Sequence, residues 1–310
     1  MKTFSNNFKL AVCAAMMTAA IFTACKKDEV VVTPPDPIGG FNNSNEVGGT
    51  NLKAHWTFDG SNNEVISSSA PTTSLRSSFV TGVKGQALNL DSGFVLYPSI
   101  AALNSLTAGS VTVSCWIKTS NNGSKATNVF GLARTIAKQN DWNTGSVLVY
   151  LENGKPLSYN DTLVLHSGFR TFPYGPDSTS FYGDNINDYG VRETDFKTVK
   201  GAGKWVHYVM RYDGAGSNID IFADGIMVSN KNFRYRTMGA PAVGLGSFVA
   251  ASPALVIIGA FPNAACGFTN SAIQGWQGFY TGGIDELRYF STALSDANIS
   301  ALYQLEKAGR

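Results

Sequence analysis

The stretch from Gly203 to Ser229 decides the fold of this chain. It begins with GKWVHYVMRYDG (203–214), in which apolar residues alternate with polar ones, and it continues with NIDIFADGIMVS (218–229). Alternation with a period of two indicates a strand that is buried on one face, and Asp-Gly directly after such a run indicates a hairpin turn. Residues 204–229 therefore predict consecutive antiparallel strands. We expect one shared buried face, made of Val206, Tyr208, Met210 and Tyr212.

Segments of the same kind recur along the chain, separated by clusters of Gly, Asn, Asp and Ser. They are KAHWTF (53–58), QALNL (86–90), FVLYP (94–98), SVTVSCWIKT (110–119), SVLVYLE (146–152), TLVLHS (162–167), ALVIIGAF (254–261) and GIDELRYF (283–290). Short β-branched and aromatic runs at this density are typical of strands in sandwiches and jelly rolls. The sequence therefore predicts an all-β, two-sheet antiparallel jelly-roll sandwich.

One helix is expected, close to the C-terminus. Ser295 is suited to cap its N-terminus, Leu294 and Ile299 have the spacing of a hydrophobic staple, and Ile299 with Leu302 forms a short apolar stripe. No internal repeat is visible. We therefore predict one domain over residues 51–307.

The residues before this domain have the pattern of an exported lipoprotein. Residues 1–24 carry two lysines and then the apolar run LAVCAAMMTAAIFTA (10–24), which is typical of a signal peptide, with an uncleaved anchor helix as the alternative. FTAC (22–25) resembles a lipobox with Cys25 as the lipidated residue. Residues 25–50 predict a tether that is stiff where it is Pro-rich and flexible where it is Gly/Asn-rich. KKDE (26–29) resembles an export signal of outer-membrane lipoproteins displayed on the cell surface.

Composition and cysteine content narrow the function further. The chain of 310 residues is 44% hydrophobic and 15% charged with a net charge of +2, and no Lys/Arg cluster is interleaved with aromatics, so nucleic acid is not an expected partner. Signal removal and lipidation leave Cys115 and Cys266 in the domain. We expect two buried thiols rather than a disulfide, since Cys115 alternates with core residues.

Five motifs, in order, resemble those of LamG-like (concanavalin A-like) jelly rolls. They are LKAHWTFDG (52–60), GVKGQALNLDSG (82–93), SVTVSCWIKT (110–119), the pair of hairpins at 203–229, and GGIDELRYFSTALSDANISALY (282–303). The resemblance covers nearly all of the chain after the tether. It implies a sandwich shared by lectins, sugar-binding modules, adhesion domains and some glycoside hydrolases, so activity has to be argued from the site.

Catalytic motifs are missing from the sequence. The signature E-x-D-x-x-E of hydrolases with this fold does not occur, and Asp285 and Glu286 are adjacent in a strand, which predicts opposite faces. The sequence contains no G-x-S-x-G, P-loop or H-E-x-x-H, and its histidines (His55, His166, His207) are scattered, with a structural role expected for His207. We therefore predict that the protein is not an enzyme.

A structural calcium ion is one of two predictions for Asp285. Strand parity places this carboxylate on the core side with Leu287, where it needs a partner. The family resemblance implies Ca²⁺ shared with acids in the loop after the first strand, here Asp59 and Glu64, although calcium prefers six to eight oxygens. The alternative is that backbone amides or a basic side chain satisfy Asp285.

A polar and aromatic insert offers a glycan-binding surface. Sugar recognition uses flat aromatic faces together with Asp and Asn hydrogen bonds, and HSGFRTFPYGPDSTSFYGDNINDYGVR (166–192) supplies both, as do loops around two tryptophans. The alternative is that these aromatics cover a sheet face or plug one end of the sandwich. The predicted ligand-binding residues are Trp142, Phe172, Tyr174, Tyr182, Asp184, Tyr189 and Trp276. Asn187 also has a side chain suited to hydrogen bonds with a sugar.

These features together predict a surface-anchored, noncatalytic carbohydrate-binding lipoprotein of a glycan-utilisation system. Its expected partners are a polysaccharide or oligosaccharide, the outer membrane through the lipid anchor, and other surface lipoproteins. The alternatives are an adhesion or structural lipoprotein that binds a protein, and a glycoside hydrolase with an unrecognised carboxylate pair.

Overall fold

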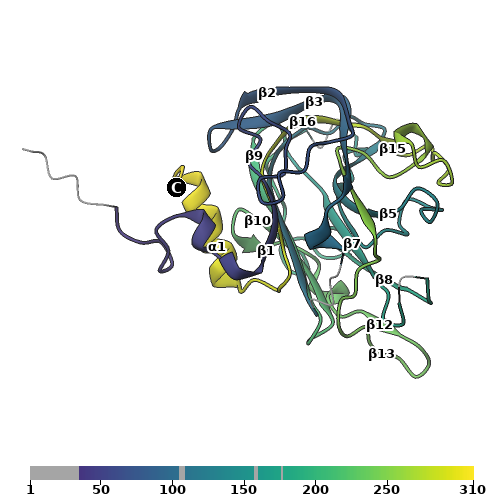
Figure 1. Ribbon diagram of the computed structural model, residues 1–310. Coiled ribbons are helices and arrows are strands. Elements are labelled where there is room, and N and C mark those ends of the chain that lie inside the picture. Colours follow the sequence, from purple (N-terminus) through teal and green to yellow (C-terminus); the bar gives the residue numbers. More distant parts are fainter. Residues whose placement is uncertain (1–34, 105–108, 157–159, 176) are drawn as a thin grey trace, which may run out of the picture. The chain divides into compact units, whose positions relative to one another are not determined.

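The computed structural model describes residues 35–104, 109–156, 160–175 and 177–310, and most of its regular structure is antiparallel β-sheet (Figure 1). The strands are β1 (Leu52–Trp56), β2 (Thr73–Thr81), β3 (Gln86–Ser99), β4 (Val111–Lys118), β5 (Ala126–Arg134), β6 (Val147–Leu151), β7 (Leu165–Thr171), β8 (Phe181–Ile186), β9 (Trp205–Asp213), β10 (Asn218–Ala223), β11 (Ile226–Met227), β12 (Thr237–Met238), β13 (Val243–Gly244), β14 (Ala254–Ile258), β15 (Gln277–Gly278) and β16 (Tyr280–Phe290). The helices are α1 (Asp296–Lys307) and the 3-10 turns η1 (Ser44–Glu46), η2 (Gly49–Asn51), η3 (Ala101–Leu103), η5 (Lys231–Phe233) and η6 (Ala264–Cys266).

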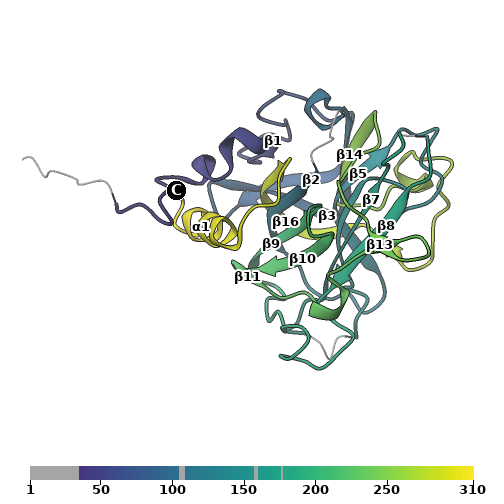
Figure 2. The same ribbon diagram turned by 90° about the horizontal axis from the view of Figure 1, so that it is seen from below.

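The strands lie in two layers, which Figure 2 shows from below. One layer has the order β11-β10-β9-β4-β16 and the other the order β14-β5-β6-β7-β8. Strand β3 joins them, because its first half pairs with β16 and its second half with β14. Strand β1 adds to β16, β2 adds to β3, and β15 pairs with β5 in parallel. This confirms the predicted jelly-roll sandwich.

The hairpins that decided the prediction are present. Strand β9 pairs antiparallel with β10, and β10 pairs with β11 across a turn in which Asp224 and Gly225 have φ of 50° and 81°. Positive φ at both central residues is the geometry of the tight turns that match strand twist. The predicted face of β9 is buried in the core, at Val206, Tyr208, Met210 and Tyr212.

The core lies between the two layers, and one tyrosine crosses it. Tyr208 on β9 is fully buried, and its hydroxyl donates to the carbonyls of His166 (2.8 Å) and Tyr150 (3.1 Å) on the opposite layer. The same hydroxyl lies 2.7 Å from Ser167 Oγ. Apolar packing sets the spacing of the layers, and this directional contact fixes how β6 and β7 lie on β9.

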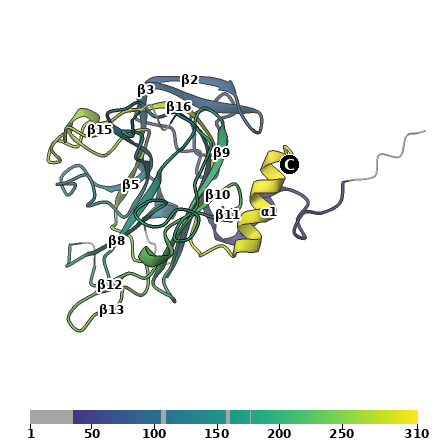
Figure 3. The same ribbon diagram turned by 180° about the vertical axis from the view of Figure 1, so that it is seen from behind.

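Helix α1 covers the outer face of the first layer, on the side away from β5 and β8 (Figure 3). Its predicted cap is confirmed, since Ser295 Oγ accepts from the amide of Asn298 at 3.1 Å, and Leu294, Ile299 and Leu302 pack in one apolar cluster. Trp116 of β4 donates from Nε1 to Glu306 of the helix at 2.7 Å. A buried helix face therefore explains why β4 is buried on both of its faces.

A bulge in β16 corrects the predicted orientation of Asp285. Asp285 pairs with Trp116 and Arg288 pairs with Ser114, so two residues of β16 lie opposite one residue of β4, and Glu286 has a φ of 45°. An extra residue reverses strand parity. Asp285 therefore lies on the same face of the sheet as Trp116, and this is the face that α1 covers. The prediction that Asp285 lies on the core side is wrong.

Residues 36–50 differ from the flexible tether that was predicted. They belong to the compact unit that spans Asp36–Arg310. Val47 is buried in the cluster formed with α1, and Ser44 and Asn45 accept hydrogen bonds from Arg288 at 3.2 and 2.9 Å. The buried guanidinium needs these acceptors, which is why a Gly/Asn-rich segment is held in place.

Two further predictions concern cysteines and membrane segments. Cys115 and Cys266 are buried free thiols, as expected. Residues 1–34, with the predicted signal peptide and Cys25, lie outside the described residues. Within the described ranges, no helix has the length and apolar character needed to cross a membrane.

Candidate functional site

Two tryptophans from distant segments meet at one pocket. Trp142 lies in the loop between β5 and β6, Trp276 lies just before β15, and their ring centroids are 5.0 Å apart. They line a cavity of about 400 Å³ together with Tyr150, Glu152 and Lys155. We call this cavity the tryptophan pocket. Its volume is in the range of small-ligand sites, and its wall combines aromatic faces with one acid and one base.

Hydrogen bonds between the two loops hold the indole rings in place. Trp276 Nε1 donates to Gln274 at 2.7 Å, and Gln274 Nε2 donates to Asp141 at 3.0 Å. Asp141 also accepts from the backbone amide of Trp142 at 2.8 Å. The amide and carboxylate side chains therefore connect the loop of one tryptophan to the loop of the other.

Tyr150 forms the floor of the tryptophan pocket. It projects from β6 on the face opposite to the core residues Val149 and Leu151, since side chains alternate along a strand. Its ring lies 5.9 Å from that of Trp142 and stacks on His166 at 4.3 Å with an interplanar angle of 29°. Burial raises the pKa of its hydroxyl far above the ordinary value, so it remains a neutral donor.

A chain of charges runs across the outer face of the second layer. His166 Nδ1 lies 2.9 Å from Glu152, and its Nε2 lies 3.3 Å from Asp184. Arg236 in turn contacts Asp184 at 2.8 Å. Burial lowers the pKa of His166, but hydrogen bonds to Asp184 and Glu152 outweigh it and leave the pKa above its usual value. The imidazole of His166 thus holds Glu152 at the edge of the tryptophan pocket.

Two predicted residues meet at a second, smaller cavity of about 260 Å³. Asp184 and Tyr189 line it with His166, Phe233 and Arg236. Tyr189 is 67% exposed. Asp184 is committed to His166 and Arg236, so this cavity offers fewer polar groups to a ligand than its composition suggests.

The other predicted residues lie elsewhere. Tyr182 lies over Gly168, where an added Cβ would be 2.4 Å from its hydroxyl, and Arg170 lies over its ring at 5.5 Å. Phe172 is 1% exposed, so it belongs to the interior and not to the site, whereas Tyr174 is 72% exposed in the loop after β7. Asn187 is buried and accepts from the amide of Leu165 at 2.7 Å, which is a structural role.

The insert itself is not a set of display loops. Residues 166–192 contain most of β7 and all of β8, which form the hairpin at the end of the second layer. Phe169 and Thr171 are buried, but the alternating outward positions hold His166, Arg170 and Tyr182. Large outward side chains hide the polar-apolar alternation that would have identified β8 and the second half of β7.

Backbone amides hold the acids of the predicted calcium site. Asp285 accepts from Val83 (2.7 Å) and Lys84 (3.1 Å), and burial raises its pKa to about 7. Glu64 accepts from His55 at 2.7 Å and Asp59 from Gln86 at 2.7 Å, both from the backbone. No group of three or more His, Cys, Asp or Glu that could hold a metal occurs in the described part of the chain. These contacts favour the alternative in which backbone amides, rather than a metal, satisfy Asp285. Bound calcium remains a prediction.

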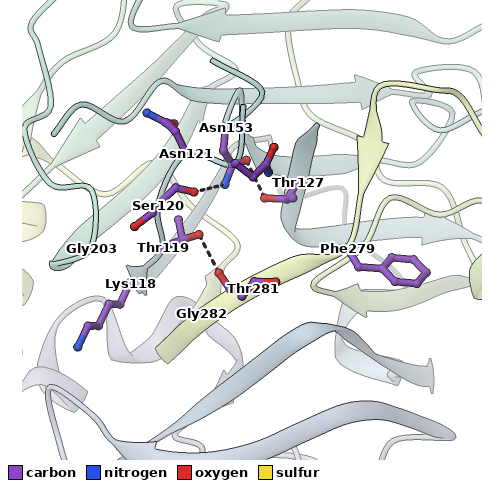
Figure 4. Close-up of a pocket in the computed structure, with 11 residues that line it drawn as sticks. Lys118, Thr119, Ser120, Asn121, Thr127, Asn153, Gly203, Phe279, Thr281 and Gly282 are labelled. Carbon is purple, nitrogen blue, oxygen red and sulfur yellow. Dashed lines mark hydrogen bonds between the residues drawn. The ribbon is translucent and has the colours of Figure 1, made fainter. Parts of the chain in front are cut away.

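A further cavity of about 430 Å³ opens at one end of the sandwich (Figure 4). We call it the polar end pocket. Thr127 Oγ1 donates to Asn153 at 2.8 Å, Asn153 donates to the carbonyl of Ser120 at 3.4 Å, and Thr119 donates to the carbonyl of Thr281 at 2.8 Å. Amides and hydroxyls thus form much of its wall, and Lys118, Phe279 and two glycines complete the lining.

Several site residues escaped the sequence-based prediction. Tyr150, Glu152, His166 and Arg236 come from strands or from a loop that showed no motif. A signal existed for Tyr150. The strand VLVYL (147–151) has apolar side chains on both of its faces, which indicates that its outer face is covered as well.

Comparisons with known proteins agree with the fold. The family model described as the concanavalin A-like lectin/glucanases superfamily (Laminin_G_3) matches residues 95–300. The chain also resembles the solved binding domain of Paraclostridial Mosquitocidal Protein 1, with a TM-score of 0.52, 11% identity, and coverage of 83% of this chain and 52% of that one. It resembles the ligand-binding domain of botulinum neurotoxin serotype D in complex with N-acetylneuraminic acid, with a TM-score of 0.50, 12% identity, and coverage of 84% and 52%. The chain thus spans about half the length of these toxin domains. No curated protein matches it.

Proposed function

We propose that this chain, which belongs to the concanavalin A-like lectin/glucanase superfamily, binds a carbohydrate chain in the tryptophan pocket and acts as a noncatalytic, surface-anchored binding protein. The superfamily supplies a fold used for sugar binding, and the botulinum domain of the same fold was solved with a sugar, N-acetylneuraminic acid. The fold alone does not select a ligand, so the proposal depends on the pocket.

The contact between Trp142 and Trp276 carries the proposal. Two indole rings 5.0 Å apart, with Tyr150 beneath, offer flat apolar surfaces to the C–H faces of a sugar ring. Glu152 contacts His166 through one oxygen and Lys155 contacts Asp188 at 2.8 Å, so each keeps a further acceptor or donor for hydroxyl groups at the same pocket. Aromatic faces edged by a few polar groups are what an uncharged, hydroxyl-rich ligand requires.

The contacts of the nearby acids support a noncatalytic role. Glu152 and Asp184 both contact the single imidazole of His166, at 2.9 and 3.3 Å. Hydrolysis of a glycosidic bond requires one carboxyl group to protonate the leaving oxygen and another to attack or activate water. Two carboxylates already paired with one histidine are poorly placed for either task.

Binding and its dependence on the two tryptophans can be tested together. In native gels that contain arabinan, xylan, galactomannan or polysialic acid, we expect at least one glycan to retard the purified protein. Trp142→Ala and Trp276→Ala should abolish most of the retardation, and Tyr235→Ala, which removes an aromatic that is 58% exposed elsewhere, should not. Lack of retardation by every glycan would contradict the proposal.

The proposed surface location depends on the sequence of residues 1–29, which lie outside the described residues. We propose that Cys25 is lipidated and that the protein is displayed on the outer membrane beside other lipoproteins that degrade or import glycans. Labelling with radioactive palmitate should be lost in Cys25→Ser, and protease added to whole cells should digest the wild-type protein. A stoichiometric protein partner captured from membranes without competition by glycan would instead favour the adhesion alternative.

A further inference from the structure

The tryptophan pocket and the polar end pocket meet at the same two segments of chain. Ala126 and Glu152 line the tryptophan pocket. The residues that follow them, Thr127 and Asn153, line the polar end pocket. Ala126 and Thr127 are consecutive residues of β5, and consecutive residues of a strand point to opposite faces. One pocket therefore lies on the outer face of the second layer and the other lies between the layers, with a shared rim at 122–126 and 152–154.

Hydrogen bonds hold this rim in one arrangement. The amide of Asn122 donates to the carbonyl of Asn153 at 2.8 Å, and the amide of Ala126 donates to the carbonyl of Trp276 at 2.9 Å. Lys125 Nζ also donates to the carbonyl of Gly275 at 2.6 Å. The loop of Trp276 is thus tied directly to the rim of the polar end pocket.

The side chains at the centre of the polar end pocket carry no charge. Figure 4 shows Thr119, Ser120 and Asn153 gathered together, whereas the side chains of Lys118 and Phe279 point away from them. Anion sites in proteins use Arg, Lys or clustered backbone amides, and cation sites use carboxylates. Amides and hydroxyls at the centre, with the charged group of Lys118 directed away from them, favour a neutral ligand that has many hydroxyl groups.

The walls of this pocket are also rigid. Asn153 is 2% exposed and bonds to both Thr127 and Ser120. Gly282 has a φ of 134°, and a Cβ there would lie 2.0 Å from the carbonyl oxygen of Lys118, so only glycine permits this approach of β16 to β4. A preformed polar wall loses little entropy when a ligand binds.

We propose that the polar end pocket is a second subsite for the glycan bound at the tryptophan pocket, so that one neutral oligosaccharide chain crosses the shared rim and occupies both. This inference rests on the proposed function. It specifies the ligand as an extended, uncharged chain longer than the tryptophan pocket alone can hold.

The experiment compares short and long ligands in the full protein. Isothermal titration would use arabino-, xylo- and manno-oligosaccharides of two and six residues. Ser120→Trp fills the polar end pocket from an exposed position, Ser120→Ala tests the position without bulk, and Thr73→Trp places the same bulk on the exposed strand β2 as a control. Melting temperatures would verify that each variant is folded.

We expect Ser120→Trp to weaken hexasaccharide binding tenfold or more, while disaccharide binding by this variant stays within twofold of wild type. Thr73→Trp should bind both ligands within twofold of wild type. Ser120→Ala, which removes only the hydroxyl group, should weaken hexasaccharide binding less than Ser120→Trp does. Equal hexasaccharide affinity in Ser120→Trp and wild type would overturn the second subsite, and the proposed function would stand if Trp142→Ala still weakened binding. Equal loss for both ligand lengths would also overturn it, since the change would then have disturbed the tryptophan pocket. If no oligosaccharide bound the wild-type protein, both proposals would fail.

Discussion

The indole rings of Trp142 and Trp276 pack edge to face, with an interplanar angle of 84° and centroids 5.0 Å apart. One ring belongs to the loop after β5 and the other to the loop after β14, so the contact exists only because β5 and β14 are neighbours in the second layer. Each ring supports the other, and Phe261 packs against both, at 5.7 Å and 5.0 Å. The aromatic surface of the tryptophan pocket is therefore one unit rather than two separate rings.

Loss of the two tryptophans should not be additive. We expect Trp142→Ala and Trp276→Ala each to weaken glycan binding about tenfold, or about 1.4 kcal/mol. The double variant should lose less than the sum, because each single change already removes the support of the other ring. A double-mutant cycle measured by titration calorimetry tests this, and strict additivity would show that the rings act independently.

Stability near neutral pH should depend on His166. Its folded-state pKa is raised above the ordinary value, because hydrogen bonds to Asp184 and Glu152 outweigh burial. A raised pKa means that the stabilisation is complete below about pH 6.5 and is lost as pH rises through the folded-state value. Urea melts between pH 5.5 and 8.5 should show that His166→Gln removes part of the decline seen in wild type. Parallel curves for the two proteins would contradict the assignment.

Tyr208 and Tyr289 form a matched pair for testing the contact across the core. Tyr208→Phe removes a hydroxyl that bonds to two carbonyls and lies beside Ser167, and it should cost about 1 to 3 kcal/mol of unfolding free energy. The hydroxyl of Tyr289 is buried and has no hydrogen-bond partner among the described residues. Tyr289→Phe should therefore be neutral or stabilising. Chemical denaturation measures both, and equal losses would refute the distinction.

The buried ion network behind α1 should be sensitive to loss of its cation. Arg288 is fully buried, contacts Glu286, and donates to Glu306 at 2.8 Å. Arg288→Met leaves both carboxylates without this partner and should destabilise the protein by about 3 to 5 kcal/mol. Arg76→Met on the exposed strand β2 is the control. A change below about 1 kcal/mol in Arg288→Met would mean that the acids protonate at little cost, and a melt at low pH would reveal this.

Calcium should have little effect on stability. Asp285, Glu64 and Asp59 already accept backbone hydrogen bonds, so a metal would have to displace protein donors. We expect the melting temperature to be the same in excess EDTA and in millimolar CaCl₂. A rise of several degrees with calcium, absent in Asp285→Asn, would support the predicted calcium site.

Much of the fold could be predicted because alternation and turn residues are local properties. The faces of β4 and β9, the Asp-Gly turn at Asp224 and the cap at Ser295 are each specified within a few residues. Strands β2, β5 and β8 were missed, as were the two-residue strands β12, β13 and β15. In β2 most residues are exposed, and in β5 nearly all are buried, so neither shows alternation.

Asp285 illustrates what a period of two cannot predict. The bulge at Glu286 reverses parity between Ile284 and Leu287, both of which are core residues, and no residue type at that point requires it. The segment 36–50 is a second case, because its Gly/Asn-rich composition is typical of a linker. The buried guanidinium of Arg288 and the apolar cluster beside α1, both formed far along the chain, supply the reason for it to be ordered.

For the site, the sequence by itself determined that the chain is a jelly-roll sandwich and that aromatic and polar residues gather between Trp142 and Arg192 and around Trp276. Tertiary structure decided which of them act together. It joined Trp142 to Trp276, turned Tyr150 outward between them and His166, and buried Phe172. The physical reason is that strand periodicity is encoded over a few residues, whereas a pocket forms from loops whose proximity depends on how the two layers pair and close.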